Sequence, residues 1–193
     1  MVNENCFEMI KKKTVLNILL ILIIVSFFVT PLGHYCKIVL NQLFSFPPIT
    51  IEADNRKQLT HYDWQLKDSN WNFFSFERSK GRVVFINFWA SWRLPCEAEM
   101  ASIQSLYEKY QGQMDFYIIT NENRPPVEKF MEEQEFTFPL TYLIIGEPAP
   151  IPIPEPPHSY LIDKNGFVVI NKDGIADWNS NEVHQTIDKL ISQ

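Results

Sequence analysis

The stretch VVFINFWASWRLPC, at Val83–Cys96, decides the fold. Val83–Phe88 is apolar on both of the faces between which a strand alternates, as is typical of a central strand covered on both sides. Pro95 is tolerated in the first turn of a helix, and the predicted helix runs to about Gln111 before Gly112 ends it. The apolar residues of that helix fall on one stripe: Cys96, Met100, Ile103, Tyr107 and Tyr110. The stretch therefore predicts a buried strand that leads through a short turn into a helix.

Segments on either side of this stretch predict further strands and a helix. Before it, Trp64–Leu66 and Asn72–Phe76 have the pattern of short strands. After it, Asp115–Thr120 and Leu140–Ile145 are apolar enough for buried strands, and Pro126–Gln134 between them has helical spacing.

The C-terminal part predicts a hairpin and a last helix. Lys164–Gly166 is a turn signal between the strands Ser159–Asp163 and Phe167–Asn171. Asn179 and Glu182 resemble a capping box. The helix that follows has one apolar face: Val183, Ile187, Leu190 and Ile191. This order of elements predicts an α/β fold, with a central mixed sheet and helices on both faces.

Composition and charge exclude some classes of partner and binding site. The chain has 193 residues, of which 46% are hydrophobic, so a sizeable core is available. A formal net charge of -6 gives no basic footprint, and we expect no nucleic-acid partner. The three cysteines are too far apart for a zinc cluster or an evident disulfide framework. We expect no metal and no cofactor.

The N-terminus predicts a membrane anchor. Lys11–Lys13 precede the apolar run Val15–Val29, and Thr14 and Thr30–Leu32 extend it toward the roughly 20 residues of a full span. A buried core helix is disfavoured by the three adjacent lysines. A cleaved signal peptide is disfavoured because no Ala-x-Ala pattern follows the run. We therefore predict an uncleaved transmembrane signal anchor over residues 14–32.

The lysines also predict the topology, because cytoplasmic flanks of membrane helices are rich in lysine and arginine. Residues 1–13 are predicted to be a cytoplasmic tail. Residues 33–61 are predicted to be a juxtamembrane linker, with Phe46–His61 as a tether. Residues 62–193 are predicted to be a folded extracytoplasmic domain, periplasmic if the cell is Gram-negative.

This topology places the three cysteines on different sides of the membrane. Cys6 is predicted to be cytoplasmic, whereas Cys36 and Cys96 face an oxidising space. Lipoprotein processing at Cys36 is disfavoured because the bulky His34 and Tyr35 precede it. Cys36 is either a free thiol in the headgroup region or part of a disulfide between two chains.

Two motifs carry a resemblance to a known family. Phe88–Trp92, followed by Arg93–Cys96, resembles the signature of the TlpA/ResA group of membrane-tethered thioredoxin-like oxidoreductases, in which F-W-A-x-W precedes C-x-x-C at the start of a helix. Their second motif, P-x-x-[FY]-L-I-D-x-x-G, corresponds to Pro157–Gly166. The resemblance extends from about Trp64 to the C-terminus and implies a thioredoxin-like fold.

The resemblance also implies a chemistry that this chain lacks in part. In the family, an exposed cysteine at the helix start attacks a substrate disulfide, and a buried cysteine one turn later resolves the mixed disulfide. Cys96 matches the resolving cysteine, and Glu99 matches an acid that handles protons nearby. Arg93 stands in the place of the attacking cysteine, so a two-cysteine cycle within this motif is impossible.

Substrate-binding residues follow from the same resemblance. Pro157 matches a cis-proline that faces the motif, and the backbone of the preceding residue pairs with the bound peptide in the family. That residue is Pro156 here, which has no N–H to donate. Trp92 matches a family aromatic, with packing as the alternative role. The proline-rich Pro148–Pro157 is either an altered recognition surface of polyproline II type or a surface loop.

Several alternatives remain open for single residues. Cys96 is either a functional thiol, made more acidic by Arg93 if it is reachable, or a buried leftover that packs as a small hydrophobe. Glu99 is either the family acid or a surface or helix-start carboxylate. A metal site at Cys96 and His158 is incomplete because the sequence offers no further ligands.

Two functional hypotheses result. The favoured one is a redox-inactive relative that binds or scaffolds a protein partner outside the membrane. The alternative is a thiol-disulfide oxidoreductase that acts on protein thiols or disulfides through the single thiol Cys96, in the degenerate motif Trp92-Arg93-Leu94-Pro95-Cys96. Accessibility of the Cys96 thiol separates the two hypotheses.

Overall fold

The computed structural model describes the backbone of residues 2–193 and the side chains from Lys12 onward. The predictions for Cys6 and for the side chain of Lys11 lie outside the described residues. The chain divides into two compact units, Met1–Leu40 and Asn41–Gln193, and each is described by itself.

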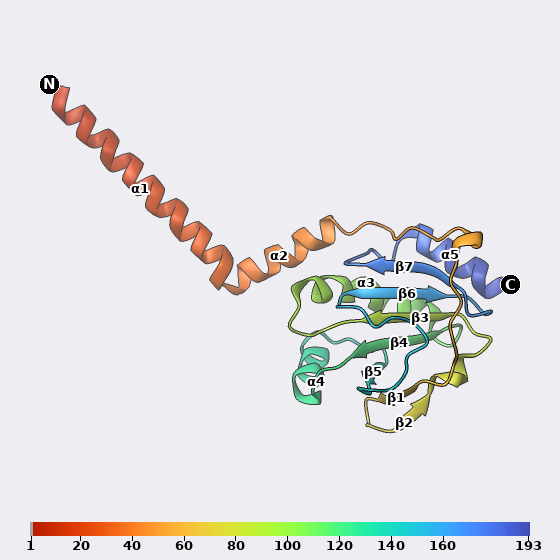
Figure 1. Cartoon of the computed structure of the whole chain (residues 1–193). Coiled ribbons are helices and arrows are strands. Elements are labelled where there is room, and N and C mark those ends of the chain that lie inside the picture. Colours follow the sequence, from red (N-terminus) through yellow and green to blue (C-terminus); the bar gives the residue numbers. More distant parts are fainter. Residues whose placement is uncertain (1) are drawn as a thin grey trace. The chain divides into compact units, whose positions relative to one another are not determined.

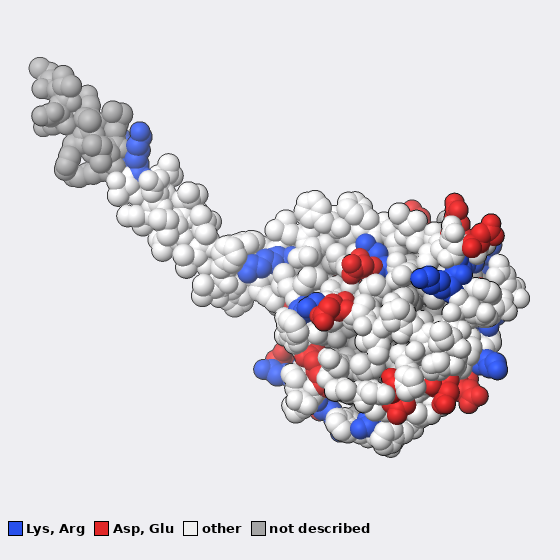
Figure 2. Space-filling view, viewed as in Figure 1, with Lys and Arg blue, Asp and Glu red and all other residues white. Residues whose placement is uncertain are grey.

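The first unit contains helix α1 (Val2–Val29) and most of helix α2 (Pro31–Leu43). Within α1, Lys12–Val29 has a mean hydropathy of 2.1 and is not buried inside the structure. Among the described residues this is the one helix that is long and apolar enough to cross a membrane. The sequence has no Lys, Arg, Asp or Glu from Thr14 to Cys36, and Figure 2 shows an uncharged surface next to the blue lysine side chains of α1.

A tight junction joins the two helices. The Thr30 hydroxyl donates to the carbonyl of Ser26 at 2.8 Å and accepts the N–H of Gly33 at 3.2 Å. A Cβ atom at Gly33 would lie 2.0 Å from the carbonyl oxygen of Phe27, so this position requires glycine. The start of the predicted juxtamembrane linker, residues 33–61, is helical as far as Leu43.

The second unit is built on a seven-stranded mixed sheet, shown in Figure 1. The strands lie in the order β2-β1-β5-β4-β3-β6-β7. Strands β3, β4 and β5 are parallel to one another, and the other neighbouring pairs are antiparallel. The strand bounds are β1 (Gln65–Asp68), β2 (Phe73–Ser75), β3 (Val84–Phe88), β4 (Asp115–Thr120), β5 (Leu140–Leu143), β6 (His158–Ile162) and β7 (Val168–Asp173). The predicted α/β fold with a mixed sheet is confirmed.

Three helices follow these strands, and all of them pack on the same face of the sheet. They are α3 (Leu94–Tyr110), α4 (Arg124–Glu133) and α5 (Asn181–Ser192). One core cluster joins Phe85 of β3 to Met100 of α3, Val127 of α4 and Ile187 of α5. The expectation of helices on both faces was wrong. The crossovers β3-α3-β4 and β4-α4-β5 advance in the same direction across the sheet, and right-handed crossovers then place both helices on one side.

The opposite face is covered by irregular chain and by the short 3-10 helix η2 (Phe76–Ser79). A second core cluster joins Trp64 and Ile86 to Leu59 and Ile151. The N–H of Ile51 donates to Val169 at 2.7 Å, and the N–H of Leu59 donates to Gly166 at 2.9 Å. Much of the segment predicted to be a tether is thus hydrogen-bonded to the hairpin β6–β7. Its apolar side chains cover this face of the sheet, as the side chains of a helix would otherwise do.

The last helix begins one residue later than its predicted cap. Ser180, rather than Asn179, is the N-cap of α5, and its hydroxyl accepts the N–H of Val183 at 3.4 Å. The predicted apolar face is buried at Val183, Ile187 and Leu190. Asn179 and Ser180 can both act as an N-cap. The three-residue spacing from Asn179 to Glu182 predicted Asn179, and this prediction was wrong.

This difference is testable by a pair of alanine substitutions. We expect Ser180→Ala to lower the free energy of unfolding by about 1 kcal/mol, because it removes the acceptor for a helix N–H. Asn179→Ala, the matched control, should cost only a few tenths of a kcal/mol, as exposed substitutions usually do. Urea titrations of the two variants measure both values, and the reverse ranking would contradict the capping assignment.

Candidate functional site

The end of strand β3 gathers the site because its neighbours bring other segments to the same edge. Phe88 pairs with His158 of β6, so Pro157 lies beside the start of the motif. Phe88 also pairs with Ile119 of the parallel strand β4, so Ser91 and Glu122 each follow three residues later. The Pro156–Pro157 bond is cis, as the resemblance to the TlpA/ResA group implies.

Glu122 fixes the turn of the motif. Its carboxylate accepts the backbone N–H of Ser91 at 2.6 Å and the Ser91 hydroxyl at 2.8 Å. Glu122 was not among the site residues predicted from the sequence. Its position just after a parallel strand was a usable signal, because the carboxyl ends of neighbouring parallel strands meet at one edge of a sheet.

Arg93 caps helix α3 by backbone only and directs its side chain across the site. Its guanidinium donates through Nη1 to the carbonyl of Pro156 and pairs through Nη2 with Glu155 at 3.1 Å. The guanidinium carbon also lies 5.0 Å from the ring centre of Trp92. The arginine therefore bridges the helix start and the segment that precedes the cis-proline.

Cys96 lies in the first turn of α3, after Leu94 and Pro95, and its side chain is 0% exposed. Burial raises the pKa of its thiol to about 12. The hydrogen bond with Ala90 and the charge of Arg93 lower that pKa, but they do not offset the burial. The thiol is therefore protonated at neutral pH and out of contact with solvent.

Glu99 is buried beneath the motif, with a side chain that is 1% exposed. Its carboxyl accepts the indole N–H of Trp178 at 2.5 Å, the N–H of Ala176 at 3.2 Å and the amide of Asn87 at 3.3 Å. Burial raises its pKa to about 7, although these hydrogen bonds act in the opposite direction. The alternative of a surface carboxylate was wrong, because three donors hold this group in the core.

A recess with both apolar and polar lining residues opens beside Trp92. It has a volume of about 210 Å³, and its lining includes Trp89, Ile119, Ile153 and Pro154. Trp92 is 70% exposed and Ile153 is 46% exposed, so apolar surface reaches solvent at its rim. The proline-rich segment forms this rim on one side and buries Ile151 in the sheet cover on the other.

His158 takes no part in a metal site within the described chain. Its Nε2 lies 2.6 Å from the side-chain oxygen of Asn171, on the neighbouring strand. No group of three or more potential metal-ligating His, Cys, Asp or Glu side chains occurs among the described residues. Cys36 is a free, exposed cysteine in the N-terminal unit.

Comparison with known proteins agrees with this geometry. Residues 59–147 match the AhpC/TSA family. A solved thiol:disulfide interchange protein of the thioredoxin family from Chlorobium tepidum superposes with a TM-score of 0.54, at 20% identity over 70% of this chain and 97% of that one. The second unit has a thioredoxin-like fold.

Sequence relatives of this thioredoxin-like domain include oxidoreductases. The chain is 38% identical over 96 residues to the thiol-disulfide oxidoreductase ResA of Bacillus cereus, covering 47% of this chain and 54% of ResA. It is 26% identical over 130 residues to the thioredoxin-like protein YneN of Bacillus subtilis, covering 65% of this chain and 75% of YneN. The chain spans about half the length of the ResA proteins it matches. The resemblance found in the sequence is thereby confirmed.

The raised pKa of Glu99 predicts a pH-dependent stability of the thioredoxin-like domain. Below its ordinary pKa of 4.5 the carboxyl is protonated in both the folded and the unfolded state. As the pH rises, the unfolded chain loses this proton first, so stability falls until the pH passes the folded pKa of about 7. We expect a loss of about 3 kcal/mol across this window.

Denaturant titrations at a series of pH values measure this loss. Glu99→Gln should flatten the profile between about pH 5 and pH 8, whatever its effect on absolute stability. Glu132→Gln, at an exposed position on α4, is the matched control and should keep the wild-type slope. An unchanged slope in Glu99→Gln would contradict the assignment.

Proposed function

We propose that this chain is a membrane-tethered, redox-inactive relative of thiol-disulfide oxidoreductases, which binds or scaffolds a protein partner outside the membrane. The observation that carries the proposal is the pair of residues at the motif. Arg93 occupies the position from which a thiolate would attack, and Cys96 is buried with a thiol pKa of about 12.

The state of Cys96 disfavours a single-thiol mechanism. Nucleophilic attack on a disulfide requires a thiolate that is reachable by the substrate sulfur. A thiol with a pKa of about 12 is almost wholly protonated at neutral pH, and a side chain with no exposed surface cannot meet a protein disulfide. The alternative function through Cys96 alone therefore lacks support from the site.

Extended-peptide capture beside the cis-proline is also impeded. Pairing of a peptide with the residue before that proline needs a backbone donor and a backbone acceptor. Pro156 has no N–H, and its carbonyl already accepts from Arg93. A partner that approaches this site must displace Arg93 or bind elsewhere on its rim.

The exposed apolar rim of the recess beside Trp92 supports partner binding without strand pairing. Exposed aromatic side chains at the edge of a recess are frequent anchors of protein interfaces. Trp92 and Ile153 offer such a surface directly next to the arginine bridge. We infer that a protein segment with an apolar side chain contacts the domain there.

Membrane tethering is part of the proposal. The apolar stretch Lys12–Val29 is long enough to cross a bilayer at about 1.5 Å per residue when its flanks are included. The adjacent lysines favour a cytoplasmic N-terminus. The thioredoxin-like domain would then lie outside the cytoplasm.

The test of redox inactivity restores the missing nucleophile. We expect negligible multiple-turnover reduction of a small disulfide by the wild type. Arg93→Cys should gain measurable activity, because positions 93 and 96 are one helical turn apart and a helix N-terminus favours the new thiolate. Turnover with a fluorescent diglutathione substrate measures both.

Two controls make this result specific. Arg93→Cys combined with Cys96→Ser should lose the gain, since no resolving thiol remains. Arg124→Cys places a thiol on the exposed surface of α4 and should stay inactive. Sustained turnover by the unmodified protein would refute the proposal.

The topology is testable by labelling thiols with a membrane-impermeant maleimide. The reagent is added to intact cells in which it can reach the outer face of the membrane that carries the anchor. A thiol introduced by Arg124→Cys should react from outside, because the side chain at this position is exposed. Cys6, tested in a Cys36→Ser background, should react only after the inner face is opened. Cys96 stays silent in both cases because it is buried. Labelling of Cys6 from outside would overturn the predicted orientation.

A further inference from the structure

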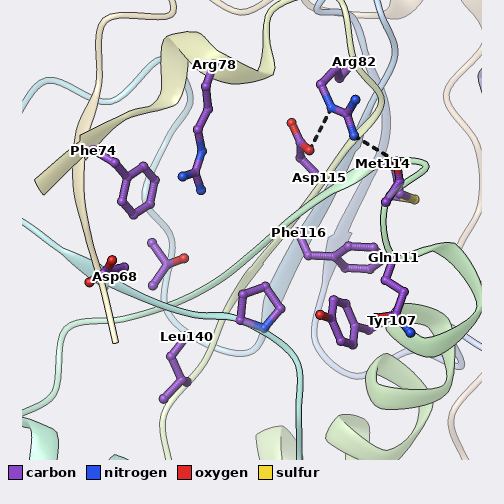
Figure 3. Close-up of a pocket in the computed structure, with 13 residues that line it drawn as sticks. Asp68, Phe74, Arg78, Arg82, Tyr107, Gln111, Met114, Asp115, Phe116 and Leu140 are labelled. Carbon is purple, nitrogen blue, oxygen red and sulfur yellow. Dashed lines mark hydrogen bonds and ion pairs between the residues drawn. The ribbon is translucent and has the colours of Figure 1, made fainter. Parts of the chain in front are cut away.

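A second recess lies at the opposite end of helix α3 from the motif. It has a volume of about 570 Å³ and opens where β4 and β5 begin and α3 ends. Figure 3 shows its wall, which includes Phe74, Arg78, Tyr107, Asp115 and Phe116. Helix α3 has 17 residues, so at about 1.5 Å per residue its length separates this recess from Arg93.

Arg78 presents an unused guanidinium to this recess. The residue belongs to the 3-10 helix η2 (Phe76–Ser79), and its guanidinium carbon lies 3.9 Å from the ring centre of Phe74. Its Nε donates to the hydroxyl of Tyr117 at 3.3 Å. Among the described residues, neither terminal nitrogen of Arg78 has a hydrogen-bonded or ion-paired partner. In Figure 3 these nitrogens point into the space between Phe74 and Asp115.

A buried polar network holds Arg78 in this position. The Tyr117 hydroxyl lies 2.5 Å from the Ser79 hydroxyl, and Ser79 donates to Asp115 at 2.6 Å. Asp115 in turn pairs with Nε of Arg82 at 2.8 Å. Tyr117 and Ser79 are both 0% exposed. The arginine fork is therefore fixed by stacking and hydrogen bonding before any ligand arrives, which lowers the entropic cost of binding.

The charges around the recess favour a ligand with a single negative charge over a dianion. Arg82 and Asp115 neutralise each other, and the carboxylate of Asp68 lies on the same wall as Arg78. Two arginines and two aspartates leave the lining formally neutral. A dianion such as phosphate would meet two carboxylates, whereas a single carboxylate matches the planar fork of Arg78.

The remaining wall includes aromatic and aliphatic side chains, which favour an organic body on that carboxylate. The rings of Tyr107 and Phe116 pack edge to face with centroids 5.2 Å apart, and Leu140 lies below them. A volume of about 570 Å³ is within the usual range for small-molecule sites. We propose that this recess binds a small organic monocarboxylate, with Arg78 holding the carboxylate and the aromatic wall holding the apolar body.

The experiment uses the full chain in lipid nanodiscs, with hydrocinnamate as the probe and empty nanodiscs as the blank. Saturation-transfer NMR measures a dissociation constant for hydrocinnamate and for its uncharged amide, which has the same shape. We expect saturable binding of the carboxylate and at least about tenfold weaker binding of the amide, since a charge-assisted bidentate pair is lost.

Two arginine variants locate the site. Arg78→Gln should weaken hydrocinnamate binding about tenfold, whereas Arg124→Gln, at an exposed ion pair on α4, should bind as the wild type does. Equal binding of the acid and the amide, wild-type affinity in Arg78→Gln, or no saturable binding would each overturn the proposal. The comparison of acid with amide decides the matter even if Arg78→Gln does not fold. None of these results depends on the redox state of the motif.

Discussion

Strand β3 is buried on both faces along its whole length, and the position of every residue in the motif depends on this constraint. A strand covered on both sides must be flanked in the sheet, and here β4 and β6 are the neighbours. Their registers place Glu122 under the turn and the cis-proline beside it. The site is thus assembled by sheet pairing, and the short turn from Trp89 to Arg93 is held from both sides before the helix begins.

Beneath this turn, Glu99 links the elements that the sheet alone does not join. Its carboxyl connects α3 to Asn87 on β3 and to Ala176 and Trp178, which precede α5. Asn87 continues the network to Ser159 of β6 at 2.9 Å. Burying an ionised carboxylate costs free energy unless hydrogen bonds stabilise it. The three hydrogen bonds to Glu99 offset only part of this cost, so its pKa remains raised to about 7. The pKa of Glu99 therefore lies close to neutral pH, where a carboxyl can both take up and release a proton, although Arg93 stands in the place of the attacking cysteine.

The sequence predicted most of this arrangement, since long apolar strands and an amphipathic helix have strong patterns. The buried strand at Val83–Phe88, the helix after Pro95 and the hairpin at Lys164–Gly166 were all found from periodicity and turn residues. What it did not predict depends on distant contacts. The sequence left Glu99 open between the family acid and a surface carboxylate, because its partner Trp178 lies 79 positions away. The segment around Leu59 looked like a tether because its apolar residues are sparse. The one-sided placement of the helices required the order of the strands, which no local pattern contains.

In the proposed function, the missing nucleophile and the impeded peptide pairing have separate causes, although Arg93 contributes to both. Replacement of the attacking cysteine removes the nucleophile, and the guanidinium that results also occupies the carbonyl of Pro156. The missing N–H belongs to Pro156 itself and does not depend on Arg93. A cysteine at position 93 would restore the nucleophile and free the acceptor, yet the donor would still be absent. Small disulfides, which need no strand pairing, and protein disulfides, which use it, should therefore respond differently to the same substitution.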